Sequence, residues 1–201
     1  MAGYESSGIG ALIRQKTFDN YDPKLQKDTE QAYQSAVMVH GFCRNYAEQF
    51  DPDSSANLLF VGATGLGKTH LSAAIAGRVI GRGYDVVCET AQNVFADFEY
   101  ERFGRPYGKE EGEESRTDRY FTCDLLILDD LGTEMTNQFT VSCLYNILNT
   151  RLNRGAPILI NTNLTRDELK KRYDDRVTSR LFGEFLPIVF VGRDARELRL
   201  N

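Results

Sequence analysis

The hydrophobic positions of this chain form short apolar runs, and the stretches between them show helical spacing. The clearest run is LLIL at residues 125–128, which has no polar alternation and is followed by two adjacent carboxylates, Asp129 and Asp130. Such a run is typical of a strand buried on both faces of a parallel sheet. Similar runs lie at residues 57–62, 85–90, 157–161 and 187–192. The pattern therefore predicts five strands.

Helices are predicted between these strands, because apolar residues there recur three and four positions apart. A further helix is expected ahead of the first strand, with Pro23 in its first turn. The charge-rich stretch at 166–180 also has helical spacing. Strands separated by helices imply right-handed crossovers, so the expected fold class is α/β with a parallel sheet between helices. The helix ahead of the first strand is expected at about 22–50, and the helices between the strands at about 71–79, 91–103 and 141–152.

Composition limits the architecture and the class of protein. With 201 residues and 41% hydrophobic content, the chain fits one globular domain: an N-terminal segment and helix at 1–50 that lead into a core at 51–201. No apolar run approaches the roughly 20 residues that span a bilayer, and the N-terminus resembles no export signal, so a cytoplasmic protein without membrane contact is expected. The net charge of −5 restricts any nucleic-acid contact to a local surface. Reduced, buried thiols are expected at Cys43, Cys88, Cys123 and Cys143.

A glycine-rich segment, GATGLGKT at 62–69, matches the phosphate-binding pattern G-x-x-x-x-G-K-[ST] and lies between a predicted strand and a predicted helix. Glycines let successive N–H groups point at a phosphate chain, and the following helix directs its positive end to the same place. Lys68 would contact the β- and γ-phosphates of ATP, and Thr69 would offer its hydroxyl to Mg²⁺. The alternative is a plain glycine turn with a surface lysine and a capping threonine. The residues expected at the nucleotide are Gly62, Ala63, Thr64, Gly65, Leu66, Gly67, Lys68, Thr69 and His70.

His70 is included only because it directly follows the phosphate loop in the sequence. At the first turn of a helix it is expected to pack or cap, and no chemistry is assigned to it.

A phosphate-binding loop would explain the two carboxylates that follow LLIL. In a parallel α/β sheet, ligands lie at the carboxyl ends of the strands, which brings Asp129 and Asp130 near the phosphates. Asp129 would hold Mg²⁺, and Asp130 would orient or deprotonate the attacking water. Asn163, at the tip of the next strand, could hydrogen-bond the same water or the γ-phosphate. The alternatives are acids that cap a turn and an Asx turn at Asn163.

Five segments in order resemble one family: GLGKTHL (65–71), LLILDDLGTE (125–134), TNL (162–164), DDRVTSRL (174–181) and VGRDAR (191–196). They are similar to the AAA+ ATPase domain of the DnaC/DnaI-type replicative helicase loaders. The resemblance covers nearly everything from about residue 17 onward, and it implies an ASCE-type P-loop NTPase fold, here with little or no C-terminal lid domain. Full-length loaders also carry a separate N-terminal helicase-binding region, so the chain is expected to correspond to the ATPase domain.

The same resemblance implies roles for individual residues. Asn163 matches the sensor 1 position, Arg180, together with Arg176, matches the arginine finger, and Arg196 matches sensor 2. Many AAA+ proteins carry glutamate where this chain has Asp130, which is one methylene shorter, so slow hydrolysis is expected. The competing interpretation of the arginines is a solvated, charge-rich helix face.

Several functions fit these residues. The leading hypothesis is a Mg²⁺-dependent ATPase that loads a replicative DNA helicase and self-associates through the arginine-finger face. An IstB-type transposase helper ATPase, a small-molecule kinase and a nucleotide switch with little hydrolysis are the alternatives. Aromatic and basic residues alternate in FEYERFGRPYGK, a mixture suited to single-stranded DNA. The residues concerned are Phe98, Tyr100, Arg102, Phe103, Arg105, Tyr107 and Lys109. The alternative is that half of these side chains belong to the core, and the acidic run EEGEE that follows opposes a DNA groove.

Overall fold

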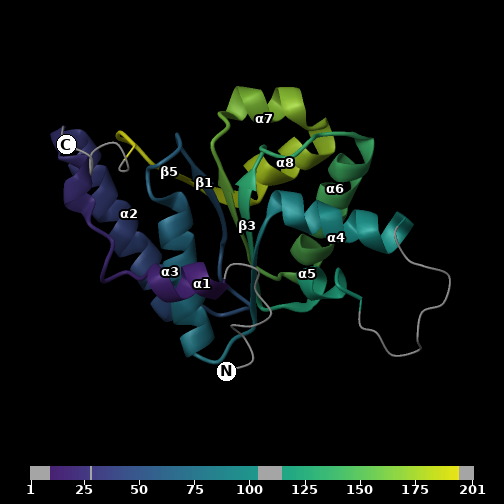
Figure 1. The fold of residues 1–201 in the computed structure, drawn as a ribbon, viewed down its shortest axis with the longest axis horizontal. Coiled ribbons are helices and arrows are strands. Elements are labelled where there is room, and N and C mark those ends of the chain that lie inside the picture. Colours follow the sequence, from purple (N-terminus) through teal and green to yellow (C-terminus); the bar gives the residue numbers. More distant parts are fainter. Residues whose placement is uncertain (1–9, 28, 104–114, 195–201) are drawn as a thin grey trace.

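The computed structural model describes residues 10–27, 29–103 and 115–194. Figure 1 shows a parallel sheet with helices on both sides, and its strand order is β2-β3-β4-β1-β5. The predicted α/β class and the five parallel strands are confirmed. The strands are β1 (Asn57–Val61), β2 (Val86–Thr90), β3 (Leu125–Leu131), β4 (Ile158–Thr162) and β5 (Phe185–Val189). The helices are α1 (Gly10–Gln15), η2 (Pro23–Gln26, a 3-10 helix), α2 (Glu30–Gln49), α3 (Lys68–Gly81), α4 (Ala91–Phe103), α5 (Asp118–Thr122), α6 (Gln138–Arg154), α7 (Arg166–Arg172) and α8 (Asp175–Gly183).

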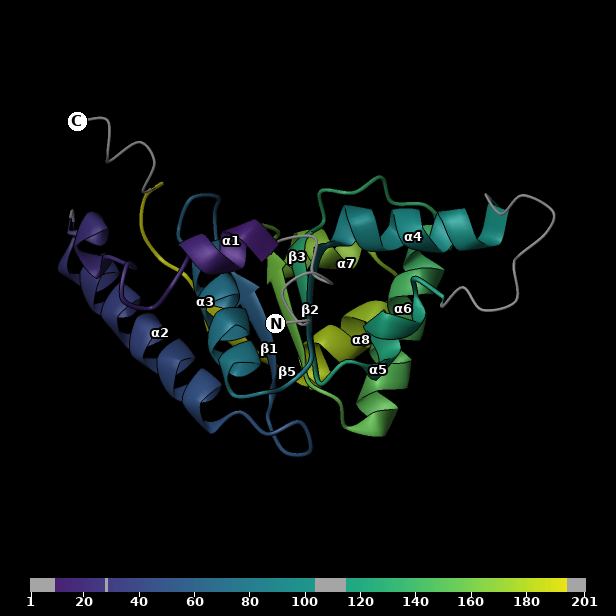
Figure 2. The same ribbon diagram turned by 60° about the horizontal axis from the view of Figure 1, so that its bottom comes forward.

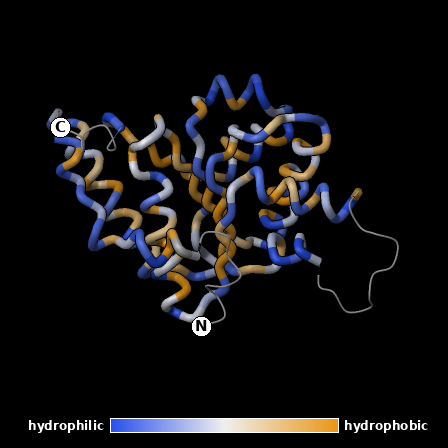
Figure 3. Tube along the Cα trace, in the orientation of Figure 1, coloured by the Kyte–Doolittle hydropathy of each residue, from blue (hydrophilic) through white to orange (hydrophobic). Residues whose placement is uncertain are grey.

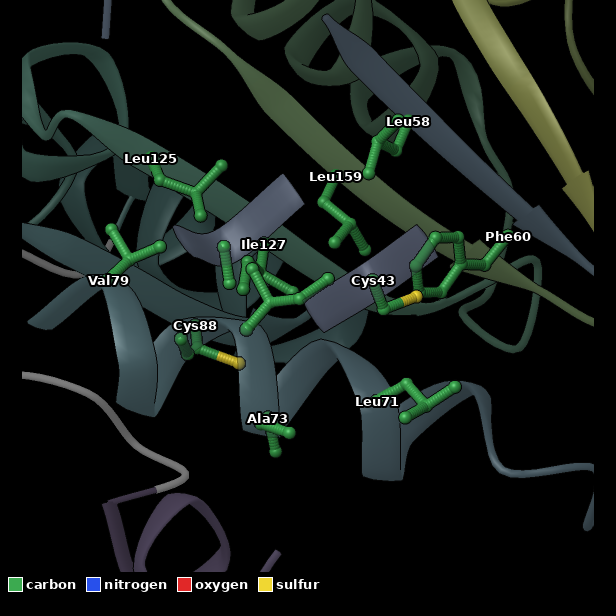
Figure 4. Close-up of a cluster of buried hydrophobic side chains, with 14 of the residues drawn as sticks. Cys43, Leu58, Phe60, Leu71, Ala73, Val79, Cys88, Leu125, Ile127 and Leu159 are labelled. Carbon is green, nitrogen blue, oxygen red and sulfur yellow. The ribbon is translucent and has the colours of Figure 1, made fainter. Parts of the chain in front are cut away.

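The helices form two layers, one on each face of the sheet (Figures 1 and 2). Helices α1, α2 and α3 lie on one side, and α4, α5, α6 and α8 lie on the other. Successive residues of a strand point to opposite faces, so Leu58 and Phe60 of β1 join the core under α3, whereas Leu59 joins the core under the second layer. Figure 4 shows Leu71, Ala73 and other side chains of α3 close to the sheet.

Hydropathy along the chain follows this layering, because the central strands form the most hydrophobic part of the trace in Figure 3. All residues of β4 are buried, as the two covering layers require. The four cysteines are free and buried, as predicted. Among the described residues, no helix is both long and apolar enough to span a bilayer.

The amino ends of the central strands are held by Arg151 of α6, whose side chain is fully buried. Its guanidinium donates hydrogen bonds to the carbonyl oxygens of Cys123 (3.0 Å) and Pro157 (2.8 Å), which precede β3 and β4. It also donates to the carbonyl of Tyr120 at 3.2 Å. Burial lowers the pKa of Arg151, and several carbonyl acceptors compensate for the lost water. Arg151 therefore holds the starts of β3 and β4 together at this edge of the sheet.

Two predicted helices are each divided in the structure. The stretch at 22–50 forms η2 and α2, because Asp22 caps the first and Thr29 caps the second by accepting a hydrogen bond from the N–H of Ala32. Pro23 begins η2 rather than the long helix. The stretch at 166–180 forms α7 and α8, because Asp174 accepts a hydrogen bond from the N–H of Val177 and starts a new helix.

Two strands differ from their predicted limits by more than one residue. β5 ends at Val189 instead of residue 192, although the N–H of Phe190 still donates to the carbonyl of Val61 at 2.8 Å. β3 extends beyond LLIL through both carboxylates to Leu131, with a register shift against β4 between Leu128 and Leu131. A polar pair after an apolar run suggested a strand end, but the bulge keeps the backbone extended past it.

Candidate nucleotide-binding site

The glycine-rich loop joins β1 to α3 at the carboxyl edge of the sheet. Gly65 and Gly67 have positive φ angles of 79° and 94°, which side chains other than glycine adopt only with strain. Gly67 is also the N-cap of α3, and it has no side chain to accept the first helical N–H groups. These donors and the positive end of the helix form an anion site of the kind that holds phosphate.

Lys68 points back into this loop and is only 5% exposed. Its Nζ donates hydrogen bonds to the carbonyl oxygens of Gly62 (2.6 Å) and Ala63 (2.8 Å) and to Oδ1 of Asn163 (2.6 Å). Burial lowers the pKa of Lys68, while the charges of Asp130 and Asp129 act in the opposite direction. The structure thus brings the predicted loop lysine and the predicted strand-tip asparagine into direct contact.

Asp129 is 4% exposed and lies beside the first turn of α3. Its Oδ1 accepts hydrogen bonds from the Thr69 hydroxyl at 3.1 Å and from Nδ2 of Asn161 at 2.7 Å. Nδ2 of Asn161 also donates to Oγ of Ser72 at 2.8 Å. Burial raises the pKa of Asp129, although the bonds from Asn161 and Thr69 counteract part of this effect.

These groups suit Mg²⁺ bound together with a nucleotide. Thr69 and Asp129 supply a hydroxyl and a carboxylate side by side, the oxygen ligands that Mg²⁺ takes. Oδ1 of Asn161 is buried and has no hydrogen-bond partner among the described residues, so it could accept a bond from a metal-bound water. The described residues contain no group of three His, Cys, Asp or Glu side chains that could hold a metal. In a nucleotide complex, phosphate oxygens and water would complete the coordination.

Asp130 occupies the bulge of β3 and is half-buried. Its φ is 55°, and among the described residues no other residue except glycine has a positive φ. The Asp130 charge acts on Lys68 more strongly than the Asp129 charge does. The Asp130 and Asp129 carboxylates therefore act on the same ammonium group.

Two segments remote in sequence flank the loop. The ring of Tyr21 lies so close to Gly67 that a side chain there would meet its Cε2 at 2.8 Å, and a side chain at Gly65 would meet the carboxylate of Asp194. His70 contacts the first of these segments: its Nε2 lies 2.9 Å from the carbonyl of Thr17 and its ring packs edge-on against Tyr21. His70 therefore fixes the N-terminal segment, in agreement with the packing role expected for it.

The two candidate finger arginines lie on α8 against α6, away from the loop of their own chain (Figure 1). Arg180 donates hydrogen bonds to Oδ1 of Asn149 (2.5 Å) and to the Tyr145 hydroxyl (3.2 Å). Arg180 and Arg176 both stack on the Tyr145 ring, at 4.6 and 4.9 Å. Arg196 lies outside the described residues.

Comparison with known proteins agrees with this geometry. The model of the IstB-like ATP binding protein family matches residues 6–183. The chain belongs to this family. The IstB-like chain is also 27% identical, over 188 residues, to the replicative helicase loader DnaC of Escherichia coli (strain K12), an alignment that covers 93% of this chain and 71% of that protein.

Solved structures support the fold of this IstB-like protein. A crystal structure of the DnaC helicase loader superposes with a TM-score of 0.71 at 21% identity and covers 88% of this chain and 97% of that one. A crystal structure of DnaI gives a TM-score of 0.70 at 19% identity, covering 92% and 93%. At these identities the similarity establishes the shared P-loop fold.

Sequence reasoning missed three residues of the site. Asn161 was assigned to a buried strand, although a polar side chain inside the apolar run PILIN is a signal that it bonds something buried. Tyr21 and Asp194 reach the loop from opposite ends of the chain. No local pattern reveals those contacts, because they depend on how the terminal segments fold back.

The buried carboxylate leads to a stability prediction. A raised pKa means that the folded state holds the proton more tightly than the unfolded chain, so stability falls as pH rises from the unfolded towards the folded pKa. At neutral pH without Mg²⁺, Asp129→Asn should therefore raise the melting temperature by on the order of a few degrees. The same variant should lose the Mg²⁺-dependent part of ATP affinity. Calorimetry of unfolding and of ATP binding, with and without Mg²⁺, measures both.

Asp53→Asn, in the exposed loop before β1, is the control and should change neither quantity. A lower melting temperature for Asp129→Asn, together with unchanged Mg²⁺ dependence, would contradict the assignment.

Proposed function

We propose that this protein is a Mg²⁺-dependent ATPase that loads a replicative DNA helicase and acts in the cytoplasm. The observation that carries the ATPase part is the convergence of Lys68, Thr69, Asp129 and Asn163 at one edge of the sheet. Membership of an ATP-binding family supports ATP as the ligand. The loader part draws on the alignment with DnaC over most of the chain.

The residues divide the work of phosphoryl transfer. Lys68 and the N–H groups of the loop bind the phosphates and stabilise the charge that develops on them. Asp130 orients the attacking water and accepts its proton, and Asn163 fixes Lys68 and the water at the γ-phosphate. Mg²⁺, when bound through Thr69 and Asp129, supplies further charge neutralisation. The short reach of Asp130 favours slow hydrolysis.

Hydrolysis is tested at Asp130. Asp130→Asn preserves size but removes the charge and basicity, so steady-state ATP hydrolysis should fall by at least about tenfold while ATP still binds. Lys68→Ala is the companion variant and should lose ATP affinity, since it removes the cation from the loop. Phosphate release and calorimetric titration measure the two effects. If phosphate release by the wild-type protein does not depend on Asp130, the nucleotide-switch hypothesis is correct instead.

A surface on α4 fits contact with single-stranded DNA. The guanidinium of Arg102 lies over the rings of Phe103 (5.2 Å) and Phe139 (5.3 Å), and Phe103 is 72% exposed. Arg116 lies 4.8 Å above the half-exposed ring of Tyr100. Exposed rings with guanidinium groups stack bases and follow a phosphate backbone.

Phe98, which also belongs to this segment, is partly buried and packs against the core of the second layer instead. Arg105, Tyr107 and Lys109 lie outside the described residues.

Loading is tested with a hexameric replicative helicase and circular single-stranded DNA. With ATP, the wild-type protein should increase the amount of helicase on the circles, as measured by pull-down of the DNA. Lys68→Ala should not, because its nucleotide site is impaired. Phe103→Ala should reduce loading and weaken DNA binding with unchanged ATP affinity, since it removes an exposed stacking ring. Phe42→Ala removes a partly buried ring of α2 that packs against the core under α3, and it serves as the matched control.

A second candidate function follows from the family itself, which is named for IstB-like proteins. A transposase helper would use the same ATPase site and DNA-binding surface. Stimulation of a cognate transposase, with no effect on helicase loading, would favour that function over the loader.

The arginine pair is proposed to act on a neighbouring copy. Arg180 and Arg176 project from α8 with Tyr145 between α8 and α6, so they form a surface feature and not a part of their own phosphate site. An arginine donated in trans stabilises charge in phosphoryl transfer by roughly 10³- to 10⁵-fold in rate. Self-association through this surface would complete the site.

A mixing experiment tests the trans role. Arg180→Ala should remove the rise in hydrolysis that accompanies increasing protein concentration, while ATP affinity is retained. Asp130→Asn keeps its arginine and Arg180→Ala keeps its carboxylate, so a mixture of the two should recover part of the lost phosphate release. If a mixed oligomer is demonstrated and phosphate release does not recover, Arg180 has no role in trans and belongs to a solvated helix face.

A further inference from the structure

Glu134 is a buried carboxylate that the proposed chemistry does not use. It lies in the loop between β3 and α6 and is 4% exposed. One oxygen, Oε2, accepts a hydrogen bond from the N–H of Gly132 at 2.7 Å. The other oxygen, Oε1, accepts from the hydroxyl of Tyr173, and Nε of Arg172 lies 3.8 Å away. Arg172 also donates to the backbone carbonyl of Glu134.

One end of this network controls the position of Asp130. The N–H and the hydroxyl of Thr133 both donate to the carbonyl of Asp130, at 3.2 and 2.9 Å. Gly132 has a φ of 103° and lies against Leu164, the residue that follows Asn163. The bond from Gly132 to Glu134 therefore fixes the turn that holds Asp130 in its left-handed conformation.

The other end of the network controls the start of α8. Tyr173 separates α7 from α8 and is 5% exposed. Asp174, the next residue, caps α8 by accepting a hydrogen bond from the N–H of Val177 at 3.0 Å. The same helix carries Arg176 and Arg180. A displacement of Glu134 would thus act on the first turn of the arginine-bearing helix.

A carboxylate is costly to bury, and an apolar residue could fill the space without that cost. Glu134 offers two acceptor oxygens that point to different elements, which an apolar side chain cannot replace. Burial and the bond to Glu134 raise the pKa of Tyr173, so its hydroxyl remains a donor at any physiological pH. The Tyr173 hydroxyl therefore stays able to bond Glu134, the residue whose other oxygen bonds the Asp130 turn.

We propose that Glu134 is a positioning residue that couples the Asp130 turn to α8, so that nucleotide at the phosphate loop changes the surface that presents Arg176 and Arg180. This inference rests on the proposed function for its nucleotide site. Under this inference, the nucleotide bound by one copy changes the α8 surface that the same copy presents to its neighbour.

Hydrogen exchange of the whole chain tests the coupling without relying on hydrolysis. The non-hydrolysable analogue AMP-PNP with Mg²⁺ should alter amide exchange in both α3 and α8 of the wild-type protein. In Tyr173→Phe, which loses only one hydroxyl, the change in α3 should persist and the change in α8 should be lost. ATP hydrolysis should fall by on the order of tenfold through kcat, with KM nearly unchanged.

Tyr120→Phe is the matched control. Its hydroxyl is also buried and donates to a carboxylate, Asp97, at 2.5 Å, but it belongs to α5 in the second layer. This variant should lose a comparable amount of stability and keep the response of α8. Glu134→Gln keeps one acceptor oxygen for the N–H of Gly132, and its amide N–H can donate to the Tyr173 hydroxyl oxygen, so it should preserve more of the response than Glu134→Ala.

The outcomes separate the coupling from the proposed function. A wild-type response in Tyr173→Phe, equal loss in Tyr120→Phe, or no α8 response in the wild type would overturn the coupling. An α8 response that depends on Tyr173 in a protein without Asp130-dependent hydrolysis would support the coupling and remove the ATPase proposal. Absence of any change in α3 would remove nucleotide binding, and the coupling with it.

Discussion

Two buried charges of opposite sign, on Lys68 and Asp129, set the conditions for the rest of this structure. Each is about 5% exposed or less, and each would be costly without partners. Carbonyls of the loop and Asn163 surround the ammonium group, while Thr69 and Asn161 bond the carboxylate. These partners come from the loop after β1, from β4 and the residue that follows it, and from α3, so both charges depend on the parallel sheet bringing its carboxyl edge together.

The two edges of the sheet serve different purposes. At the amino edge, Arg151 binds backbone carbonyls, an arrangement that only needs to be stable. At the carboxyl edge, polar side chains replace those backbone contacts. There the pKa of Lys68 is lowered and the pKa of Asp129 is raised, so both shifts favour the neutral form of the group. A phosphate chain with a divalent cation would reverse both effects, since it brings negative charge to Lys68 and positive charge to Asp129. The site is thus less stable alone than it would be with ligand.

The sequence predicted the parts of this site that depend on local pattern. Apolar runs located all the strands, and GATGLGKT located the loop, because strand burial and phosphate binding each need particular residues at fixed spacing. It did not predict where helices divide, since Thr29 and Asp174 act as caps only when the chain turns there. Nor did it predict contacts made by Tyr21 and Asp194, which depend on the tertiary fold.

The left-handed backbone at Asp130 is the feature that most directly connects fold to chemistry. Aspartate adopts this conformation more readily than most residues, but at some energetic cost, and such strain persists only where surrounding bonds determine it. Thr133 and Glu134 supply those bonds. In a regular strand the side chains of residues 129 and 130 would point to opposite faces of the sheet, and the register shift interrupts this alternation while β3 continues to Leu131. The proposed use of two successive carboxylates on one nucleotide depends on this bulge.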